Sequence, residues 1–284
     1  MMLDSLQQSA PLAVTAAAVL GLLVGSFLNV VIHRVPRMLE REWAQQAAEV
    51  RGEHAPAEER YDLIVPRSHC PSCGHRIGAL ENIPLLSWLR QRGKCTACGA
   101  SIPARYPIVE LATGALSAIA VWRFGATAEG LGAVVLTCFL IALAFIDLDT
   151  QLLPDNMTLP LLWLGLLFNL SGAFAPLPAA VIGAMAGYLS LWSIYWLFKL
   201  ATGKEGMGYG DFKLLAALGA WFGWTALPAV ILLASVVGAA VGIVLIVAAR
   251  HGREVPIPFG PYLAGAGLLA LYFRGPLANL FGVG

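Results

Sequence analysis

Three aspartates at one end of a long apolar run are the leading candidates for chemistry in this sequence. Asp147, Asp149 and Asp155 lie in the stretch Phe-Ile-Asp-Leu-Asp-Thr-Gln-Leu-Leu-Pro-Asp, with apolar segments on both sides. A carboxylate in or beside lipid is costly, which makes it a candidate for function. A short polar loop where a helix leaves the membrane explains the same acids without any chemistry. A second acid elsewhere would favour a catalytic pair.

Asp211 is that second acid, in the glycine-rich sequence Gly-Met-Gly-Tyr-Gly-Asp-Phe-Lys at 206–213. By itself it is typical of an acid near a helix N-terminus, and the glycines are expected to let the backbone pass close to another element. Paired with an acid from 145–155, it can share a proton across the two carboxylates. One acid then activates a water as general base, and the other polarises the scissile carbonyl. The chain contains no P-loop, H-E-x-x-H or G-x-S-x-G motif.

The spacing of the acids limits which of them can form the pair. In a helix, Asp147 and Asp149 point about 200° apart, so both cannot face the same partner. Asp155 follows Pro154 and is expected to cap the next helix. Lys213 is expected either to stabilise an ionised Asp211 or to anchor the chain at the membrane interface.

A second chemical feature is a set of cysteines. Four of the five form two close pairs, Cys70 with Cys73 and Cys95 with Cys98. Two C-x-x-C turns can place four thiolates in a tetrahedron around Zn²⁺, and the glycine after each pair relieves the tight backbone. Such a site would be structural, because four sulfurs leave no open position. Two redox disulfide pairs, or His69 or His75 replacing one cysteine, remain alternatives, and Cys138 is expected to be inert packing.

The elements that position these groups are predicted to be membrane helices. The chain has 284 residues, of which 58% are hydrophobic and 12% charged, and its mean hydropathy is +0.73. Soluble domains contain about 25% charged residues, so this is a polytopic membrane protein. Eight apolar runs predict eight spans, at 11–32, 106–124, 130–146, 157–174, 178–198, 212–226, 228–249 and 259–273. The net charge of +1 gives no indication of a nucleic-acid partner.

Most charges lie between residues 33 and 105, which predicts a polar domain inserted between the first two helices. The expected organisation is a first transmembrane helix at 1–33, a cytoplasmic domain with the tetracysteine zinc site at 34–105, and a seven-helix membrane bundle at 106–284. Basic residues follow the first span rather than precede it, so the N-terminus is predicted to be outside and not a cleaved signal peptide. Both acid motifs then lie at the cytoplasmic boundary.

Four other features carry weaker expectations. Asn29, in the sequence Gly-Ser-Phe-Leu-Asn-Val, is expected to join helices by hydrogen bonding rather than to form a site. Residues 38–61 are expected to form a surface helix broken near Gly52. Trp88, between the cysteine pairs, is expected to be buried by packing. Glu110 is either a functional acid or a hydrogen-bond partner of a neighbouring helix or of Arg105.

Taken together, these motifs resemble those of the type IV prepilin peptidases, inner-membrane aspartic proteases with a G-x-G-D motif. The resemblance covers most of the chain and rests on 25–30 with His33 and Arg34, both C-x-x-C turns, 145–155, and 208–213. It implies that Asp147 and Asp211 are the catalytic acids. It also implies cleavage of the basic leader of prepilins and type II secretion pseudopilins, after a glycine on the cytoplasmic side.

The same resemblance implies a second activity. Many family members N-methylate the new N-terminal residue with S-adenosylmethionine, and the form with a cysteine-bearing cytoplasmic domain is the one associated with it. No S-adenosylmethionine pocket is visible in the sequence. Two other classes of protein were weighed. A proton- or ion-coupled transporter would use the same acids but usually has related halves, and no repeat is present. A zinc-ribbon scaffold would not need eight membrane spans.

Overall fold

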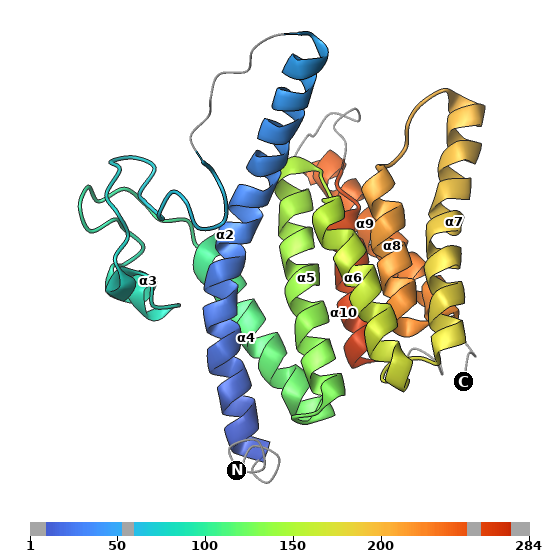
Figure 1. The fold of residues 1–284 in the computed structure, drawn as a ribbon, viewed down its shortest axis with the longest axis horizontal. Coiled ribbons are helices and arrows are strands. Elements are labelled where there is room, and N and C mark those ends of the chain that lie inside the picture. The colour runs from blue at the N-terminus through green and yellow to red at the C-terminus, as the bar shows by residue number, and fades with distance from the viewer. Residues whose placement is uncertain (1–9, 53–59, 249–256, 274–284) are drawn as a thin grey trace. The chain divides into compact units, whose positions relative to one another are not determined.

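The fold was analysed in a computed structural model, which describes residues 10–52, 60–248 and 257–273. Over these residues the ordered elements are helices and two isolated β-bridges (Figure 1). The chain divides into two compact units, Met1–Arg123 and Phe124–Gly284. Each is described by itself. The N-terminus and residues 250–256 of the predicted last inside loop lie outside the described residues.

The N-terminal unit is built on α2, a helix of 41 residues from Ala10 to Val50. The predicted first span and the predicted surface helix are therefore one continuous element, and the expectation of two separate helices was wrong. Pro36 lies inside the helix and removes one backbone hydrogen bond. The Glu, Arg, Ala and Gln residues that follow it are strong helix formers and extend the helix to Val50. Gly52 follows in the left-handed conformation, with φ +69°.

Close backbone contact joins α2 to α4, which runs from Arg105 to Phe124. A Cβ on Gly21 would lie 2.9 Å from Gly114 Cα, and a Cβ on Gly25 would lie 2.7 Å from Glu110 Cα. Small residues four apart let membrane helices approach in this way. The Asn29 amide donates to the Tyr106 carbonyl at 3.1 Å, which confirms its predicted role in joining helices.

Between α2 and α4 lie the two cysteine turns, with η1 (Ala79–Glu81) and α3 (Leu86–Arg90) linking them. Trp88 of α3 is half-buried, and its ring N–H donates to the Ile102 carbonyl at 3.1 Å. Gly93 has φ +67°, and a Cβ there would lie 2.9 Å from the Trp88 ring. Packing of Trp88 was therefore the correct expectation.

The C-terminal unit is a helical bundle around α8, Tyr209–Phe222 (Figure 1). Nearly every residue of α8 from Asp211 onward is buried, as expected for a helix that is apolar on all sides. Helices α6, α7, α9 and α10 all contact it, and α5 packs on α6 and α10. The other bounds are α5 Ala128–Thr150, α6 Asp155–Phe168, η2 Asn169–Ser171, α7 Leu177–Thr202, η3 Trp224–Ala226, α9 Leu227–Ala248 and α10 Gly260–Tyr272.

Glycines set the spacing between α7 and α8. A Cβ on Gly183 would lie 2.3 Å from the Gly219 carbonyl oxygen, and a Cβ on Gly187 would lie 2.6 Å from the Leu215 carbonyl oxygen. The two backbones therefore touch directly, which aligns α8 closely along α7.

One buried asparagine joins three segments at the far end of α8. The Asn169 amide, which is 1% exposed, donates to the carbonyls of Ala220 and Trp221 at 2.8 and 3.0 Å. Its Oδ1 accepts the N–H groups of Phe174 and Ala175, both at 2.9 Å. These four bonds satisfy the last carbonyls of α8 and the loop between α6 and α7.

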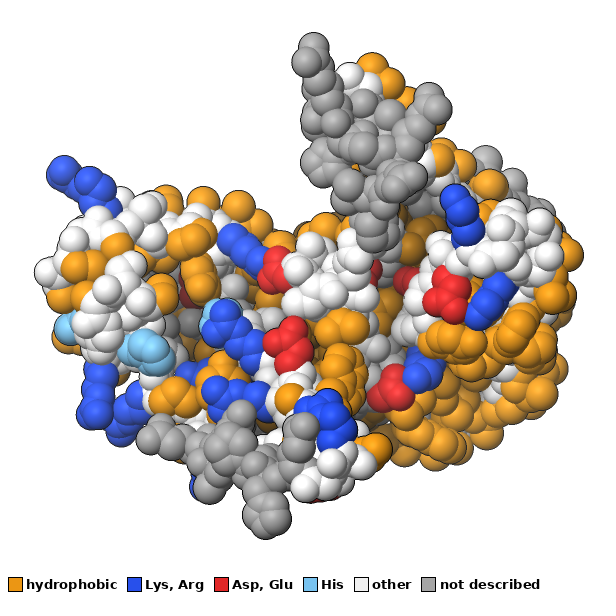
Figure 2. Space-filling model, turned by 90° about the horizontal axis from the view of Figure 1, so that it is seen from above, with side chains coloured by type: hydrophobic (Ala, Val, Ile, Leu, Met, Phe, Trp, Pro, Cys, Tyr) orange, Lys and Arg blue, Asp and Glu red, His pale blue; other side chains and the backbone are white. Residues whose placement is uncertain are grey.

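Five helices in the described part of the chain are long and apolar enough to cross a membrane: α2, α4, α5, α7, and the η3–α9 segment from Trp224 to Leu245. The protein is thus a polytopic helical membrane protein, as predicted. The other three apolar runs fold as α6, α8 and α10, which have 14, 14 and 13 residues. At 1.5 Å per residue these helices are only about 20 Å long, shorter than the ~30 Å hydrocarbon core. Apolar side chains cover much of the surface of the C-terminal unit in Figure 2.

Candidate functional site

Asp147 lies in the last turn of α5 and is only 4% exposed. The helix ends just beyond it, because Gln151 adopts the left-handed conformation at φ 55° and its N–H bonds the Asp147 carbonyl. Asp147 Oδ2 accepts the N–H of Gly260, the first residue of α10, at 2.9 Å. The amides at a helix N-terminus carry partial positive charge, so this position stabilises a carboxylate.

Asp211 lies in the first turn of α8 and is 6% exposed. Its Oδ1 is buried and has no hydrogen-bond partner among the described residues. Gly208 caps the helix, and the Asp211 N–H bonds its carbonyl at 3.2 Å. A Cβ on Gly210 would lie 2.6 Å from Leu153 Cβ, so the chain after α5 packs directly on the start of α8. The glycines therefore do let the backbone pass close to another element, as predicted.

The segment after α5 connects the surroundings of the two acids. Leu153 lies 2.6 Å from the Cβ position of Gly210, next to Asp211, and 3.1 Å from that of Gly260, whose N–H binds Asp147. The buried carboxyls at the ends of α5 and α8 are therefore close enough for the charge of one to act on the other. Two neighbouring carboxyls can share a proton, and the unpaired oxygen of Asp211 can accept a hydrogen bond from a water.

The neighbouring charged residues have other positions. Asp149 is exposed. Lys213 binds both oxygens of Asp155, at 2.6 and 2.7 Å, rather than Asp211. The N-cap of α6 is Pro154 with no side-chain cap, so the expectation that Asp155 caps this helix was wrong. Asp155 is instead the first residue of α6, where its charge favours the helix N-terminus. Of the three acids in 147–155, only Asp147 is buried.

The Gly260 amide is the group at this site that sequence reasoning missed. It is separated from Asp147 by 113 residues and belongs to a run that was interpreted only as a span. A Cβ on Gly260 would lie 2.6 Å from Asp147 Oδ2, so the absence of a side chain is part of the contact. No local pattern marks such a residue, because any glycine in a membrane helix can serve packing alone.

The second candidate site is the cysteine cluster. The sulfurs of Cys70, Cys73, Cys95 and Cys98 all lie within 4.8 Å of one another, and all four cysteines are free thiols. The Cys70–Cys98 and Cys73–Cys95 sulfur separations are 3.9 and 4.0 Å. Metal–sulfur bonds of ~2.3 Å in a tetrahedron give sulfur separations of about 3.8 Å. The cluster therefore fits a tetrahedral metal ion, and the disulfide alternative does not match it.

Both cysteine turns have the same backbone. In each, the first cysteine donates its N–H to the carbonyl five residues ahead at 2.8 Å, and the glycine after the second cysteine bonds back to the first at 2.9 Å. Gly74 and Gly99 have φ +72° and +73°, which L side chains rarely adopt. The prediction that glycine relieves these turns is therefore confirmed.

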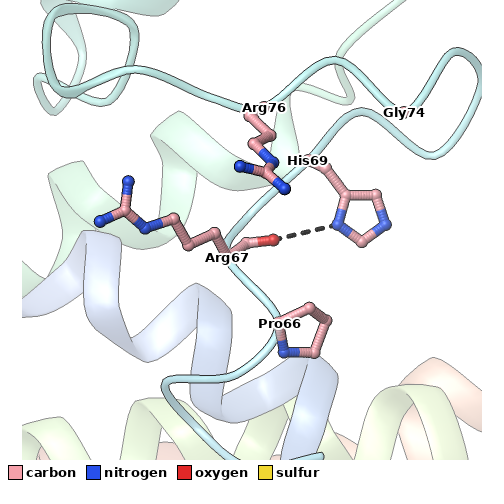
Figure 3. A pocket seen from close by; sticks show the side chains of 5 residues that line it. All are labelled: Pro66, Arg67, His69, Gly74 and Arg76. Carbon is pink, nitrogen blue, oxygen red and sulfur yellow. Dashed lines mark hydrogen bonds between the residues drawn. The ribbon is translucent and has the colours of Figure 1, made fainter. Parts of the chain in front are cut away.

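The two histidines near the cluster have other partners. His69 Nδ1 lies 3.0 Å from the Arg67 carbonyl oxygen, on the side of a shallow pocket of about 330 Å³ that also carries Arg76 (Figure 3). His75 Nε2 lies 3.1 Å from Glu81 Oε2. Neither histidine belongs to the cluster, so the structure favours four cysteine ligands over the alternative with histidine.

Glu81 joins the segments of the two cysteine turns through hydrogen bonds. Its carboxylate accepts the Gly78 N–H at 2.8 Å and the hydroxyl of Thr96, which lies in the second turn. The Gly78 amide, Thr96 and His75 together lower the pKa of Glu81 to about 2. The acid is therefore ionised at neutral pH and binds groups from both turns.

Glu110 of α4 is buried, and its Oε2 accepts the Leu85 N–H at 2.8 Å. The expected hydrogen bond is present, although its donor is the backbone before α3 rather than a helix or Arg105. This bond ties the linker between the cysteine turns to the start of α4.

These features define a polytopic membrane protein with a buried pair of acids and a tetracysteine metal cluster. Residues 19–124 match the model of the bacterial peptidase A24 N-terminal domain, and residues 134–243 match that of the type IV leader peptidase family. The chain belongs to the type IV leader peptidase family. Asp147 and Asp211 lie in the second matched region, and the four cysteines lie in the first.

Curated relatives match nearly the whole chain. A prepilin leader peptidase/N-methyltransferase of Aeromonas salmonicida strain A449 is 62% identical over 88% of this chain and 87% of the relative. Proteins of the same name from Stutzerimonas stutzeri and Pseudomonas aeruginosa are 59% and 56% identical, over 93% and 96% of this chain and 92% and 95% of the relatives. No solved structure matches the chain significantly.

Proposed function

We propose that this protein is a prepilin leader peptidase and N-methyltransferase of the bacterial inner membrane, with Asp147 and Asp211 as its catalytic acids. The observation that carries the peptidase is the placement of these two buried carboxyls on either side of Leu153, one of them with an oxygen that has no partner among the described residues. Family membership and the names of the relatives support the same activity. The substrates are prepilins and the pseudopilins of type II secretion.

In this mechanism the two acids share one proton. The ionised acid removes a proton from a water, whose oxygen attacks the scissile carbonyl carbon, while the protonated acid donates a hydrogen bond to the carbonyl oxygen. When the carbon–nitrogen bond breaks, the leaving amine takes up the proton that the general base removed from the water, which restores the starting state of the acid pair. The Gly260 N–H holds Asp147 in place through its 2.9 Å bond.

In the second activity the new N-terminal amine receives one methyl group. Bound S-adenosylmethionine would supply this methyl from its sulfonium: the amine nitrogen forms the new bond to carbon, the electron pair of the carbon–sulfur bond returns to sulfur to give S-adenosylhomocysteine, and the nitrogen releases one proton. The two activities are consistent with two compact units, because both acids lie in Phe124–Gly284 and the tetracysteine cluster lies in Met1–Arg123. We assign residues 1–33 to the first transmembrane helix, 34–105 to the cytoplasmic domain and 106–284 to the peptidase bundle.

The metal at Cys70, Cys73, Cys95 and Cys98 is proposed to be Zn²⁺. Four thiolates with no fifth donor in the cluster are typical of a structural zinc site. Zinc would join the two cysteine turns and take no part in peptide cleavage. Metal analysis of the purified protein tests this assignment, with Cys73→Ser combined with Cys98→Ser expected to lose the zinc. Unchanged zinc content in that variant would exclude these ligands.

The proposed topology has eight membrane helices, a periplasmic N-terminus and an active site at the cytoplasmic face. Helix α8 need not meet lipid along its length, since its neighbours bury it almost entirely. Cysteine accessibility from either side of the membrane, using single cysteines at positions 128 and 204, tests this orientation.

Cleavage of a purified prepilin in detergent tests the acids. Asp147→Asn and Asp211→Asn keep the side-chain volume but remove the proton-sharing pair, so cleavage should fall by at least about a thousandfold. Asp149→Asn is the matched control, because Asp149 is exposed on the same turn, and it should cleave like the wild type. Cleavage that persists in Asp211→Asn, or that is lost only in Asp149→Asn, would exclude the proposed pair.

A further inference from the structure

The N-terminal unit contains a cavity that neither Asp147 nor Asp211 lines. It has a volume of about 480 Å³, and its walls come from α2, the cysteine turns and the start of α4. Cavities of about 300–1,000 Å³ are typical of sites for small-molecule ligands. On the face seen in Figure 2, Lys, Arg and His side chains gather over this unit.

One wall of the cavity carries a buried positive charge. Arg34 of α2 is 6% exposed, and its guanidinium donates to the carbonyls of Asp62 and Pro66 at 2.7 and 2.6 Å. Its other described contact is the Tyr61 ring, 5.7 Å away. Among the described residues no acidic side chain pairs with Arg34. Carbonyl dipoles satisfy its donors without neutralising its charge, so an anion in the cavity would be strongly favoured.

Another wall carries a buried acid. Glu110 is 8% exposed, and its one described hydrogen bond is with the Leu85 N–H. It forms no ion pair with Arg34 or with another basic side chain in the described part of the chain. The cavity therefore holds two buried charges of opposite sign that do not neutralise each other. A ligand carrying both an anionic and a cationic group matches this arrangement.

A third polar group in the cavity wall also lacks a partner. The amide nitrogen of Gln91 is buried without a hydrogen-bond acceptor among the described residues. A buried donor left unpaired costs ~1–3 kcal/mol, which an acceptor on a ligand would recover. The half-buried ring of Trp88 lies in the same wall and offers an aromatic surface for a flat base, whereas the Tyr61 ring carries the Arg41 guanidinium at 4.2 Å.

We propose that this cavity is the S-adenosylmethionine site, with Arg34 binding the carboxylate of the methionyl end and Glu110 binding its ammonium group. The proposal rests on the N-methyltransferase function proposed above and adds the location and polarity of the site. Gln91 donates to an acceptor on the adenosyl part. Arg34 and Glu110 are binding residues here, and neither belongs to the acid pair that cleaves the peptide.

Direct binding tests the site without relying on methylation. Full-length protein with its metal would be dialysed in detergent against radiolabelled S-adenosylmethionine, with S-adenosylhomocysteine as competitor. Arg34→Gln and Glu110→Gln each leave one buried charge of the ligand unpaired, so the Kd should rise by about tenfold or more. Arg76→Gln is the matched control, because Arg76 lies in the shallow pocket of Figure 3 and not in this cavity.

Two further measurements keep the result interpretable. The metal content and the unfolding temperature in detergent should equal the wild-type values in all three variants, which reports an intact N-terminal unit. If Arg34→Gln does not fold, Gln91→Leu serves instead, because it removes only the unpaired donor, and its Kd should rise several-fold.

Three outcomes would overturn the assignment. Wild-type affinity in Arg34→Gln and Glu110→Gln, or in Gln91→Leu when Arg34→Gln does not fold, would exclude the cavity as the site. Displacement of the bound ligand by phosphatidylethanolamine vesicles but not by S-adenosylhomocysteine would assign the cavity to a zwitterionic lipid. A wild-type protein that cleaves prepilin but neither binds S-adenosylmethionine nor methylates the product would refute the methyltransferase function itself. If the wild type methylates the product and the variants bind S-adenosylmethionine with unaltered Kd, only the location of the site is refuted.

Discussion

The contact between Gly260 and Asp147 leads to a specific prediction about peptidase rate. In Gly260→Ala the new Cβ would lie 2.6 Å from Asp147 Oδ2 and 3.0 Å from its Cγ. Real Cβ atoms essentially never come this close to an oxygen, so the carboxyl group or the start of α10 must move. The 2.9 Å bond from the Gly260 N–H to Asp147 is then stretched or broken.

The size of the effect follows from that bond. A hydrogen bond to a charged group contributes ~1.5–3 kcal/mol, which corresponds to a roughly 10- to 150-fold loss in turnover if the lost stabilisation applies to the transition state. The loss should appear in kcat, with KM nearly unchanged, because the bond positions a catalytic acid and does not touch the substrate.

Initial rates of prepilin cleavage by purified protein measure this effect. Gly265→Ala is the matched control, since it lies on the same helix and a Cβ there meets nothing within 4 Å. Methylation of a pre-cleaved pilin by both variants should equal the wild-type rate and reports an intact N-terminal unit. A Gly260→Ala enzyme that is folded and turns over within twofold of Gly265→Ala would refute the role given to this amide.

Three further predictions concern other parts of the molecule. Lys213→Met should change the cleavage rate by less than about fivefold, because its partly exposed pair with Asp155 contributes at most ~1 kcal/mol, and a larger loss would mean that Lys213 acts on the acid pair. Gly187→Ala should lower the unfolding temperature in detergent, since its Cβ would press on the Leu215 carbonyl and overpacking costs ~1–3 kcal/mol; an unchanged temperature would contradict the direct contact of α7 and α8. The N–H groups of Val65 and Ile64 lower the pKa of Asp62 from 3.8 to about 2, so its contribution to stability is present above pH 4 and is lost as the pH falls toward 2. The protection of the Ile64 and Val65 amides against hydrogen exchange, relative to an unfolded chain at the same pH, should fall over that interval in the wild type and be low at each pH in Asp62→Asn.

Local sequence patterns predicted the features of this protein that depend on short spacing. The cysteine turns followed from C-x-x-C-G, because two residues between sulfurs and a glycine beyond them define one tight turn. The opposite orientations of Asp147 and Asp149 followed from the helical repeat, because residues two positions apart in a helix point about 200° away from each other. The apolar runs predicted the helices because a continuous apolar segment is a local property of the sequence and does not depend on distant contacts.

Features that depend on distant contacts were not predictable in this way. The continuation of α2 through Pro36 overrode a local helix-breaking signal. The Lys213–Asp155 pair joins residues 58 positions apart, and sequence alone left two other roles open for the lysine. Arg34 belongs to a sequence motif and Glu110 was a candidate acid, but their placement around one cavity became visible only in the fold, because they lie 76 positions apart in the chain.

The four hydrogen bonds of Asn169 have a mechanical consequence for the acid pair. They fasten the C-terminal end of α8 to the α6–α7 connection, whereas Asp211 lies in the first turn of α8, at the opposite end. The opposite end is held as well, because Lys213 pairs with Asp155 at the start of α6 and Gly210 packs directly on Leu153. A helix fixed at both ends keeps its side chains in place, so Asp211 is positioned for reaction before a substrate binds.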